Sequence, residues 1–438
     1  MKRYAVAFAS ILFSALVAGA EPLLLDLAKD GRLWTEPASR APEETSTADG
    51  FITQRLPGPC LLTDDLRGGE MLVRCGEGDR IRQRIQVMIY NKGDDGPCAA
   101  PFFVSTVNQA VAAITSAAGS EGVRKSVPSN SRLIDMSSWE WRGAKTLYRL
   151  DVASVGKGPK LAGEFIRLKM VPAPAPTSGT AATPGRMASP AGGGEAFERS
   201  TRSDRVNKLD LKDNLVQKGS GVAIEGIPMV DQGQKGYCAA AVMARLLEYY
   251  GLGSMDQHEL AAAMGTTADG GTSTRTMKET MEKCGHKFGL RMKSLDELDI
   301  RDYERLLKEY NRVAHRHGIS KIEAPRGVVV VGDAFWLQVD AESLVESRAE
   351  SPEKLKAWLE KMKLYIDRGV PVIWSVMCGI IPEPGVSRGG HMRLVVGYDE
   401  AAGLIYYSDT WGPGHECKPM SLSDAYAITQ ARFVLMPL

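Results

Sequence analysis

The sequence is poor in several features that mark common classes of protein. Its charges almost cancel, with 54 Lys and Arg against 53 Asp and Glu, so it lacks the basic excess of a nucleic-acid-binding protein. Beyond residue 20 it has no apolar stretch of about eighteen residues, the length that a membrane-spanning helix needs. Its seven cysteines fit no spacing of zinc ligands. We therefore expect no nucleic-acid partner, no integral membrane segment, and no metal or other cofactor.

One short apolar run does occur, at the N-terminus. Two basic residues precede an apolar run at 5–17, and small residues follow it at 18–20. This pattern predicts a Sec-type signal peptide at 1–20, and therefore a secreted or periplasmic protein. Disulfides are permitted in those compartments. Cys60 and Cys75 flank a predicted strand turn and could pair, with scattered free thiols as the alternative.

Composition divides the remaining chain into two regions. Residues 172–196 are rich in Pro, Ala, Gly, Ser and Thr, and residues 197–219 are polar and charged. Such a stretch cannot bury a core, so we interpret 172–219 as a flexible linker. It separates an N-terminal domain at 21–171 from a C-terminal domain at 220–438, and 438 residues suffice for two cores.

The N-terminal domain is expected to be a small α+β domain. Apolar and polar residues alternate as in half-buried strands at 71–75, 81–91, 146–153 and 164–171. One helix is predicted at 104–118, with Ser105 as its N-cap and Gly119 as its end. No catalytic pattern occurs there, so we expect an accessory role. Binding to substrate, binding to the cell surface and inhibition remain open.

In the C-terminal domain helices come first and strands last, an order typical of an α+β fold rather than a wound parallel sheet. Helices are predicted at 238–250, 255–264, 273–284, 296–317 and 352–368. Strands are predicted at 327–332, 335–339, 371–377, 392–398, 404–408 and 432–436. The stretch 296–350 is long for a minimal fold, so we expect an insertion there that shapes a cleft.

Cys238 begins the alanine-rich segment 238–250, which predicts a helix that ends before Gly251. A helix N-terminus favours a thiolate over a thiol, because unpaired backbone N–H groups and the helix dipole stabilise the negative charge. Gln232 lies six residues earlier in a polar loop, where its amide could meet an oxyanion. Gln234 is a competitor for that role, although the spacing favours Gln232.

His391 and Asp409 lie on a predicted hairpin. His391 begins an apolar strand, and the segment 404–409 returns beside it after a short turn. Asp409 is therefore expected within reach of one imidazole nitrogen, where it would fix the tautomer and stabilise an imidazolium. Trp411 could pack over the pair and reduce its solvation.

Each of these residues has an ordinary interpretation when taken alone. A buried Cys at a helix start is usually a small core residue, a single His is more often a polar surface or core residue, and an Asp near Gly is usually part of a turn. The catalytic hypothesis rests on their combination, since four residue types occur in one order on compatible elements. The other five histidines lack such surroundings.

With these residues, the chain resembles the papain-like cysteine peptidases, and most closely the C39-like family, over residues 222–438. The resemblance is carried by Gln232, Gly236-Tyr237-Cys238, Gly390-His391, Gly397-Tyr398-Asp399 and Asp409-Thr410-Trp411-Gly412. Ala239-Ala240 stands where the family commonly has Gly-Pro. The resemblance implies Cys238 as nucleophile, His391 as base, Asp409 as orienting residue and Gln232 as oxyanion donor. It also implies a helix packed on an antiparallel sheet, with the site in the cleft between them.

The resulting hypothesis is an exported cysteine peptidase that hydrolyses peptide bonds of peptide or protein substrates through a thioester. Two alternatives stay open. One is a catalytically unused, papain-like binding module of the cell envelope. The other is an acyltransferase or transglutaminase that uses the same Cys-His-Asp triad with an amine in place of water. The sequence leaves the oligomeric state open.

Overall fold

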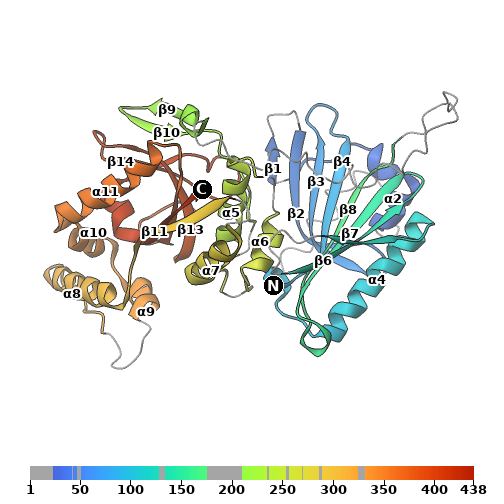
Figure 1. Cartoon of the computed structure of the whole chain (residues 1–438), viewed down its shortest axis with the longest axis horizontal. Coiled ribbons are helices and arrows are strands. Elements are labelled where there is room, and N and C mark those ends of the chain that lie inside the picture. The colour runs from blue at the N-terminus through green and yellow to red at the C-terminus, as the bar shows by residue number, and fades with distance from the viewer. Residues whose placement is uncertain are drawn as a thin grey trace. The chain divides into compact units, whose positions relative to one another are not determined.

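The computed structural model describes residues 23–41, 43–46, 51–127, 134–174, 210–233, 236–252, 256–268, 270–285, 289–323 and 331–438. The predicted signal peptide and residues 175–209 of the predicted linker lie outside them. The chain divides into two compact units, one of residues up to 201 with 266–269, and the other of 202–265 and 270–438. Each unit combines helices with an antiparallel sheet, so the fold class is α+β (Figure 1).

The first unit is built on an eight-stranded sheet with the strand order β1-β2-β3-β4-β8-β7-β6-β5. Its strands are β1 (Glu43–Ser46), β2 (Phe51–Leu61), β3 (Arg67–Gly76), β4 (Arg82–Asn91), β5 (Val123–Val127), β6 (Asp135–Arg142), β7 (Thr146–Val155) and β8 (Ala162–Pro172). Its helices are α2 (Leu24–Asp30), α3 (Lys92–Asp95) and α4 (Ala100–Ala118), with short 3₁₀ turns at Arg32–Trp34 and Gly158–Lys160. The four strands predicted from alternation correspond to β3, β4, β7 and β8.

Helix α4 lies along the sheet beside β6 and β7 (Figure 1). It buries Phe103, Ala110 and Ile114, which recur along one face. It ends at Gly119, whose φ of 67° is the left-handed conformation that favours glycine, as predicted. It begins earlier than predicted, because Ala99 rather than Ser105 precedes its first turn.

Of the two alternatives left open for Cys60 and Cys75, the structure has free thiols rather than a disulfide. Cys60 lies opposite Gly68 in the β2–β3 ladder, while Cys75 lies opposite Ile52 near its other end, so the register separates the two sulfurs. All six cysteines whose side chains the structure describes are free thiols.

The second unit contains a sheet with the order β11-β16-β12-β13-β10-β9, extended by β14 beside β13 and by β15 beside β14. Its strands are β9 (Leu215–Lys218), β10 (Gly221–Ile224), β11 (Leu290–Glu297), β12 (Val372–Cys378), β13 (Gly389–Asp399), β14 (Leu404–Ser408), β15 (Lys418–Ser421) and β16 (Thr429–Pro437). Its helices are α5 (Cys238–Tyr249), α6 (Gln257–Ala263), α7 (Thr274–Cys284), α8 (Ile300–Arg316), α9 (Val331–Gln338), α10 (Ala341–Ala349), α11 (Pro352–Ile366) and α12 (Leu422–Ile428), with a 3₁₀ turn at Asp210–Asn214.

The strands predicted at 327–332 and 335–339 are wrong wherever the structure describes them. Residues Val331–Gln338 form helix α9 instead. A short continuous apolar run fits a buried helix as well as a buried strand, so periodicity could not decide. Tertiary packing selects the helix, because the buried rings of Phe335 and Trp336 lie edge-on against tyrosines of α8.

Several elements of the second unit were not predicted. The sequence pattern missed β9, β10, β11, β15, α10 and α12. The predicted helix at 296–317 starts only at Ile300, because β11 occupies residues up to 297 and Asp299 forms a capping box with Asp302. Strand β9 lies within the predicted linker range of 172–219, so ordered structure begins before that range ends.

Helix α5 is the centre of the second core. It packs against β13, and every residue from Ala239 to Leu247 is buried. Small alanines allow this close approach, and they also favour the helix. Strand β10 also lies close to β13 near the end of that strand, since a Cβ at Gly397 would lie 2.4 Å from the Val222 carbonyl oxygen. The packing of α5 on β13 places Cys238 beside His391, near the start of β13.

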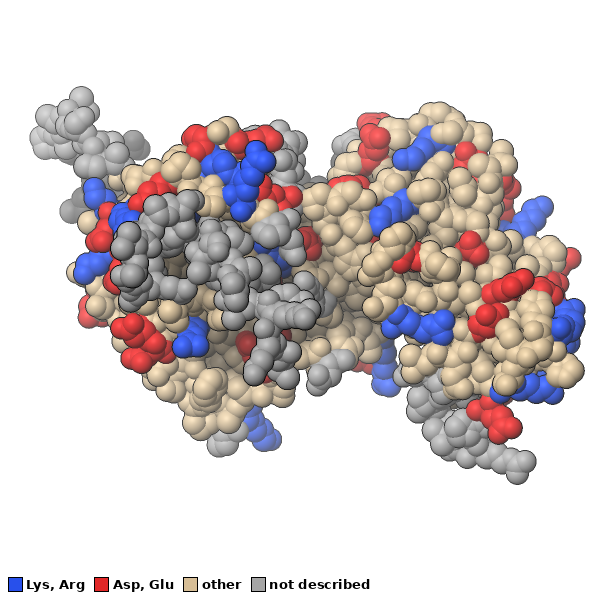
Figure 2. All heavy atoms as spheres, turned by 180° about the vertical axis from the view of Figure 1, so that it is seen from behind, with Lys and Arg blue, Asp and Glu red and all other residues tan. Residues whose placement is uncertain are grey.

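The surface carries both signs of charge. Figure 2 shows Lys and Arg interspersed with Asp and Glu over the visible face, in agreement with the balanced composition. Among the described residues, no helix combines the length and the apolar character that crossing a bilayer requires.

Candidate active site

Cys238 is the first residue of α5, preceded by Tyr237, which makes no side-chain cap. Its side chain is half-buried. Burial alone raises the pKa of the thiol, but a hydrogen bond with His391, the charge of His391 and the backbone N–H groups of Met392 and Ala239 act in the other direction. Together they lower the pKa of Cys238 below its ordinary value. The site therefore favours a thiolate.

His391 lies near the start of β13, opposite Val376 of β12. Its Nε2 is 2.5 Å from Oδ1 of Asp409. Because Nε2 faces the carboxylate, the hydrogen bond with Cys238 belongs to Nδ1. Burial lowers the pKa of His391, but the bonds to Asp409 and Cys238 outweigh it and raise the pKa to about 9. At neutral pH His391 is therefore an imidazolium, and its charge favours the thiolate form of Cys238.

Asp409 follows β14 and is fully buried. The hairpin register places Ser408 opposite Leu394, which brings Asp409 alongside the first residues of β13. Its Oδ1 also accepts the backbone N–H of Thr410 at 2.9 Å, and its Oδ2 accepts Nε–H of Arg393 at 2.8 Å. Burial raises the pKa of Asp409, but His391, Arg393 and the N–H of Thr410 lower it to about 2. The carboxylate is therefore ionised at neutral pH.

Trp411 covers the imidazole, as expected. Its ring stacks on His391 with a centroid distance of 4.6 Å and an interplanar angle of 18°. The indole shields the imidazole from water, and a cation over an aromatic face is itself a favourable contact.

Gln232 is buried and attached to the loop that carries Asp409. Its backbone N–H donates to the carbonyl of Thr410 at 2.9 Å, and its Oε1 accepts the Thr410 hydroxyl at 2.5 Å. Because the oxygen end of the amide is held in this way, the orientation of its Nε2 is fixed as well. Gln234, the competing residue, lies outside the described residues.

Sequence reasoning missed the buried arginines that hold the Asp409 segment. Arg245 of α5 donates to the backbone carbonyl of Asp409 at 2.7 Å, to Ser408 Oγ at 2.6 Å and to the Pro228 carbonyl at 2.7 Å. Arg393 of β13 binds the carboxylate itself. A charged residue inside an otherwise apolar strand was the available signal, because a buried arginine requires a partner.

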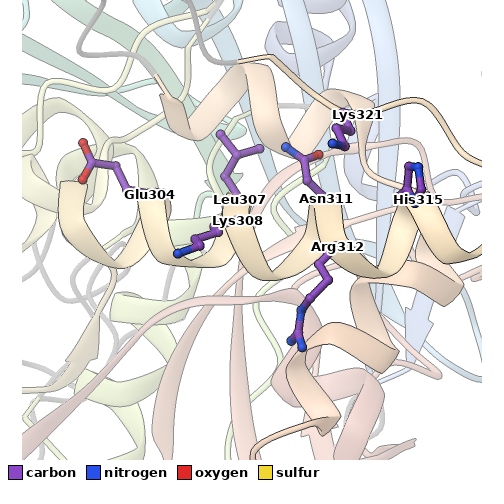
Figure 3. A pocket seen from close by; sticks show the side chains of 7 residues that line it. All are labelled: Glu304, Leu307, Lys308, Asn311, Arg312, His315 and Lys321. Atoms are coloured by element: carbon purple, nitrogen blue, oxygen red, sulfur yellow. The ribbon is translucent and has the colours of Figure 1, made fainter.

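A hollow on the second unit lies away from these residues. Its volume is about 570 Å³, and it follows the exposed side of α8 (Figure 3). It is lined by Glu304, Leu307, Lys308, Asn311, Arg312, His315 and Lys321. None of the four candidate residues lines it. Among the described residues, no group of three His, Cys, Asp or Glu side chains is arranged to hold a metal ion.

Comparison with known proteins bears on this region. Residues 340–430 match the model of the Peptidase_C39 like family. The matched segment includes His391 and Asp409, while Cys238 and Gln232 precede it. No curated protein gives a significant match to the chain. The chain thus contains a C39-like, peptidase-like domain.

Proposed function

We propose that the protein is an exported cysteine peptidase, in which residues 220–438 form a papain-like catalytic domain that acts on peptide or protein substrates. The observation that carries the proposal is the continuous hydrogen-bond chain from Cys238 through His391 to Asp409 at the start of a buried helix. This is the arrangement of nucleophile, base and orienting residue that acyl transfer requires. The match of residues 340–430 to a peptidase family adds support.

In the first half of the reaction, the Cys238 thiolate attacks the carbonyl carbon of the scissile peptide bond. Negative charge develops on the carbonyl oxygen, and Nε2 of Gln232 with the backbone N–H of Cys238 would stabilise it. The imidazolium of His391 then donates its proton to the leaving amine, the C–N bond breaks, and a thioester with Cys238 remains. Asp409 keeps the imidazole in position throughout.

In the second half, neutral His391 accepts a proton from water, and the resulting hydroxide attacks the thioester carbonyl. The C–S bond breaks and the carboxylic acid product leaves. Cys238 returns as a thiolate beside the imidazolium, so the starting state is restored without any other reactant.

The predicted signal peptide at 1–20 supports a secreted or periplasmic location. The N-terminal region at 21–171 would then act as an accessory domain, joined through the linker predicted at 172–219. The absence of a catalytic pattern in that region supports this role.

The decisive experiment is alkylation with iodoacetamide or an E-64-type probe at neutral pH, followed by mapping of the modified peptide. We expect Cys238 to react first, and we expect Cys238→Ala to lose both labelling and turnover of a peptide library. Cys378→Ala is the matched control, because burial raises the pKa of Cys378 to about 12. Preferential labelling of Cys378 or Cys417, or full turnover by Cys238→Ala, would refute the proposal.

A second arm separates hydrolysis from acyl transfer. Turnover in the presence of a primary amine is followed by mass spectrometry of the products. Free carboxylic acid as the main product supports the peptidase, whereas a predominant amide with the added amine assigns the site to an acyltransferase. Cys238 that reacts readily while no peptide or amine product forms assigns the domain to binding.

A further inference from the structure

The carboxylate of Asp409 is held by a second charged pair that the proposed mechanism does not use. Arg393 is fully buried two residues after His391, on the same face of β13. Its Nε donates to Asp409 Oδ2 at 2.8 Å. Its Nη1 and Nη2 donate to the two oxygens of Glu383 at 3.0 and 2.8 Å. One guanidinium therefore joins the triad to the loop between β12 and β13.

Glu383 is held from a further side. The hydroxyl of Tyr407 donates to its Oε2 at 2.8 Å, and the Tyr407 ring lies 4.5 Å below the guanidinium of Arg393. The ring of Trp411 lies 5.5 Å from the same guanidinium. The planar guanidinium of Arg393 is held by the carboxylates of Asp409 and Glu383 and by the two aromatic rings. These contacts leave it a single orientation. Its Nε–H fixes the plane of the Asp409 carboxylate.

The charges matter as much as the geometry. A lone arginine on Asp409 would largely cancel the negative charge that stabilises the imidazolium of His391. Glu383 supplies a second negative charge to the same arginine, so the cluster of Asp409, Arg393 and Glu383 retains a net charge of −1. The triad thus keeps the electrostatic effect of Asp409 together with the positioning by Arg393.

We propose that Glu383 and Arg393 are positioning residues that form a neutral pair, which orients Asp409 without cancelling its charge toward His391. This inference rests on the proposed function, because it concerns the same triad. It predicts that replacing Glu383 and replacing Arg393 shift the pH profile of Cys238 alkylation in opposite directions. An ion pair with a merely structural role would not produce such opposite shifts.

The first variant is Glu383→Gln, which keeps the size of this largely buried side chain and removes its charge. Arg393 then carries an unbalanced positive charge, which favours the deprotonated forms of both Cys238 and His391. We expect both inflections in the pH profile of Cys238 alkylation to move down by about half a unit to one unit. Arg393→Met removes the positive charge, and we expect both inflections to move up.

The double variant Glu383→Gln with Arg393→Met restores the net charge of the cluster to −1. We expect its inflections to return toward the wild-type positions, while kcat stays low because Oδ2 of Asp409 has lost its donor. If Arg393→Met fails to fold, Glu383→Gln and Arg393→Lys decide the question, since lysine keeps the charge but not the fork. For Arg393→Lys we expect a lower kcat with unmoved inflections.

The same other titratable side chains are present around the triad in every variant. They are Arg245 from α5, Cys378 from β12, Tyr407 from β14, and His415 and Glu416 from the loop that follows β14. The matched control is Glu350→Gln, because Glu350 at the end of α10 also accepts hydrogen bonds from two arginines, Arg312 and Arg316 of α8. Its alkylation profile should equal that of the wild type.

The alkylation profile of Cys238 can be measured without turnover. The proposed function and the positioning pair are therefore contradicted by different results. A wild-type Cys238 that is unreactive at neutral pH overturns the proposed function. A reactive wild-type Cys238 whose profile is unmoved by Glu383→Gln, or moved equally by Glu350→Gln, overturns the positioning pair alone.

Discussion

At the scale of single residues, the charge state of Cys238 depends on a chain of neighbours. The thiolate is stabilised by the imidazolium, and the imidazolium is stabilised by Asp409, whose two oxygens accept three donors. Under the proposed function, a change at Asp409 therefore acts on Cys238 through His391, without any contact between Asp409 and a substrate.

We expect Asp409→Asn to lower kcat/KM by about 10²–10⁴-fold, because the amide holds imidazole but stabilises imidazolium poorly. The loss should be smaller than that of Cys238→Ala, since nothing replaces the thiolate. The double variant should match Cys238→Ala alone, as residues that act as a unit are not additive. Steady-state kinetics on one peptide test this. Additive losses would show that the two residues act separately.

The shifted pKa values of His391 and Asp409 also predict how stability depends on pH. The pKa of His391 is raised from 6.5 to about 9, so its stabilising contribution is complete below pH 6.5 and is lost as the pH rises through 9. The pKa of Asp409 is lowered from 3.8 to about 2, so its contribution is present above pH 3.8 and is lost as the pH falls through 2.

We therefore expect the free energy of unfolding of Cys238→Ala, relative to the double variant Cys238→Ala with His391→Ala, to be constant between about pH 4 and 6.5, because the opposing titration of the thiol is removed from both proteins. The difference should shrink toward pH 9 and again below pH 4. Urea denaturation of both proteins across this range measures it. A difference that grows above pH 7 would contradict the raised pKa of His391.

At the scale of elements, the sequence predicted those that carry the site and failed where packing decides. Helix α5 and the hairpin of β13 and β14 follow from local signals, namely an alanine-rich segment closed by Gly251 and two apolar runs around a turn. Helix α9 was predicted as strand because its apolar run has no period that separates the two states.

The same limit applies to the candidate site. Cys238, His391 and Asp409 could be predicted to meet because each begins or follows an element with a clear local signature. Arg393 and Glu383 could not, since their pairing depends on how the loop between β12 and β13 folds back, and no local pattern encodes that.

The close contact of β10 with β13 at Gly397 gives an element-scale prediction. A Cβ at Gly397 would lie 2.4 Å from the Val222 carbonyl oxygen and 2.8 Å from the Cα of Ala223, so β10 must move away from β13. We expect Gly397→Ala to lower the free energy of unfolding by about 1–3 kcal/mol. Gly389→Ala is the control in the same strand, because a Cβ there meets nothing within 4 Å. Equal stability of the two variants in urea would contradict the tight contact.

At the scale of the whole molecule, the boundary of the second unit decides which fragment can fold. The unit starts at Arg202, whereas the sequence placed the start of the domain at 220. Residues between these positions include β9, which pairs with β10, and Asn214, whose Nδ2 donates to the Tyr249 hydroxyl of α5 at 3.1 Å.

We expect a fragment of residues 202–438 to fold alone and to retain turnover of small peptides at the full-chain rate, as an accessory first unit implies. A fragment of 220–438 should be less stable, because it loses β9 and the contact to α5. Thermal unfolding and peptide turnover of both fragments test this. Faster turnover by 202–438 would instead assign an inhibitory role to the first unit, and an insoluble 202–438 would mean that the units fold together.

The stacking of Trp411 on His391 has an optical consequence. A protonated imidazole accepts an electron from an excited indole far more readily than a neutral one, so emission from Trp411 should be quenched while His391 is charged. The chain has seven tryptophans, and the difference in fluorescence between the wild type and Trp411→Phe isolates this one. The fluorescence of Trp411 therefore reports the protonation state of His391, and the measurement requires neither substrate nor label.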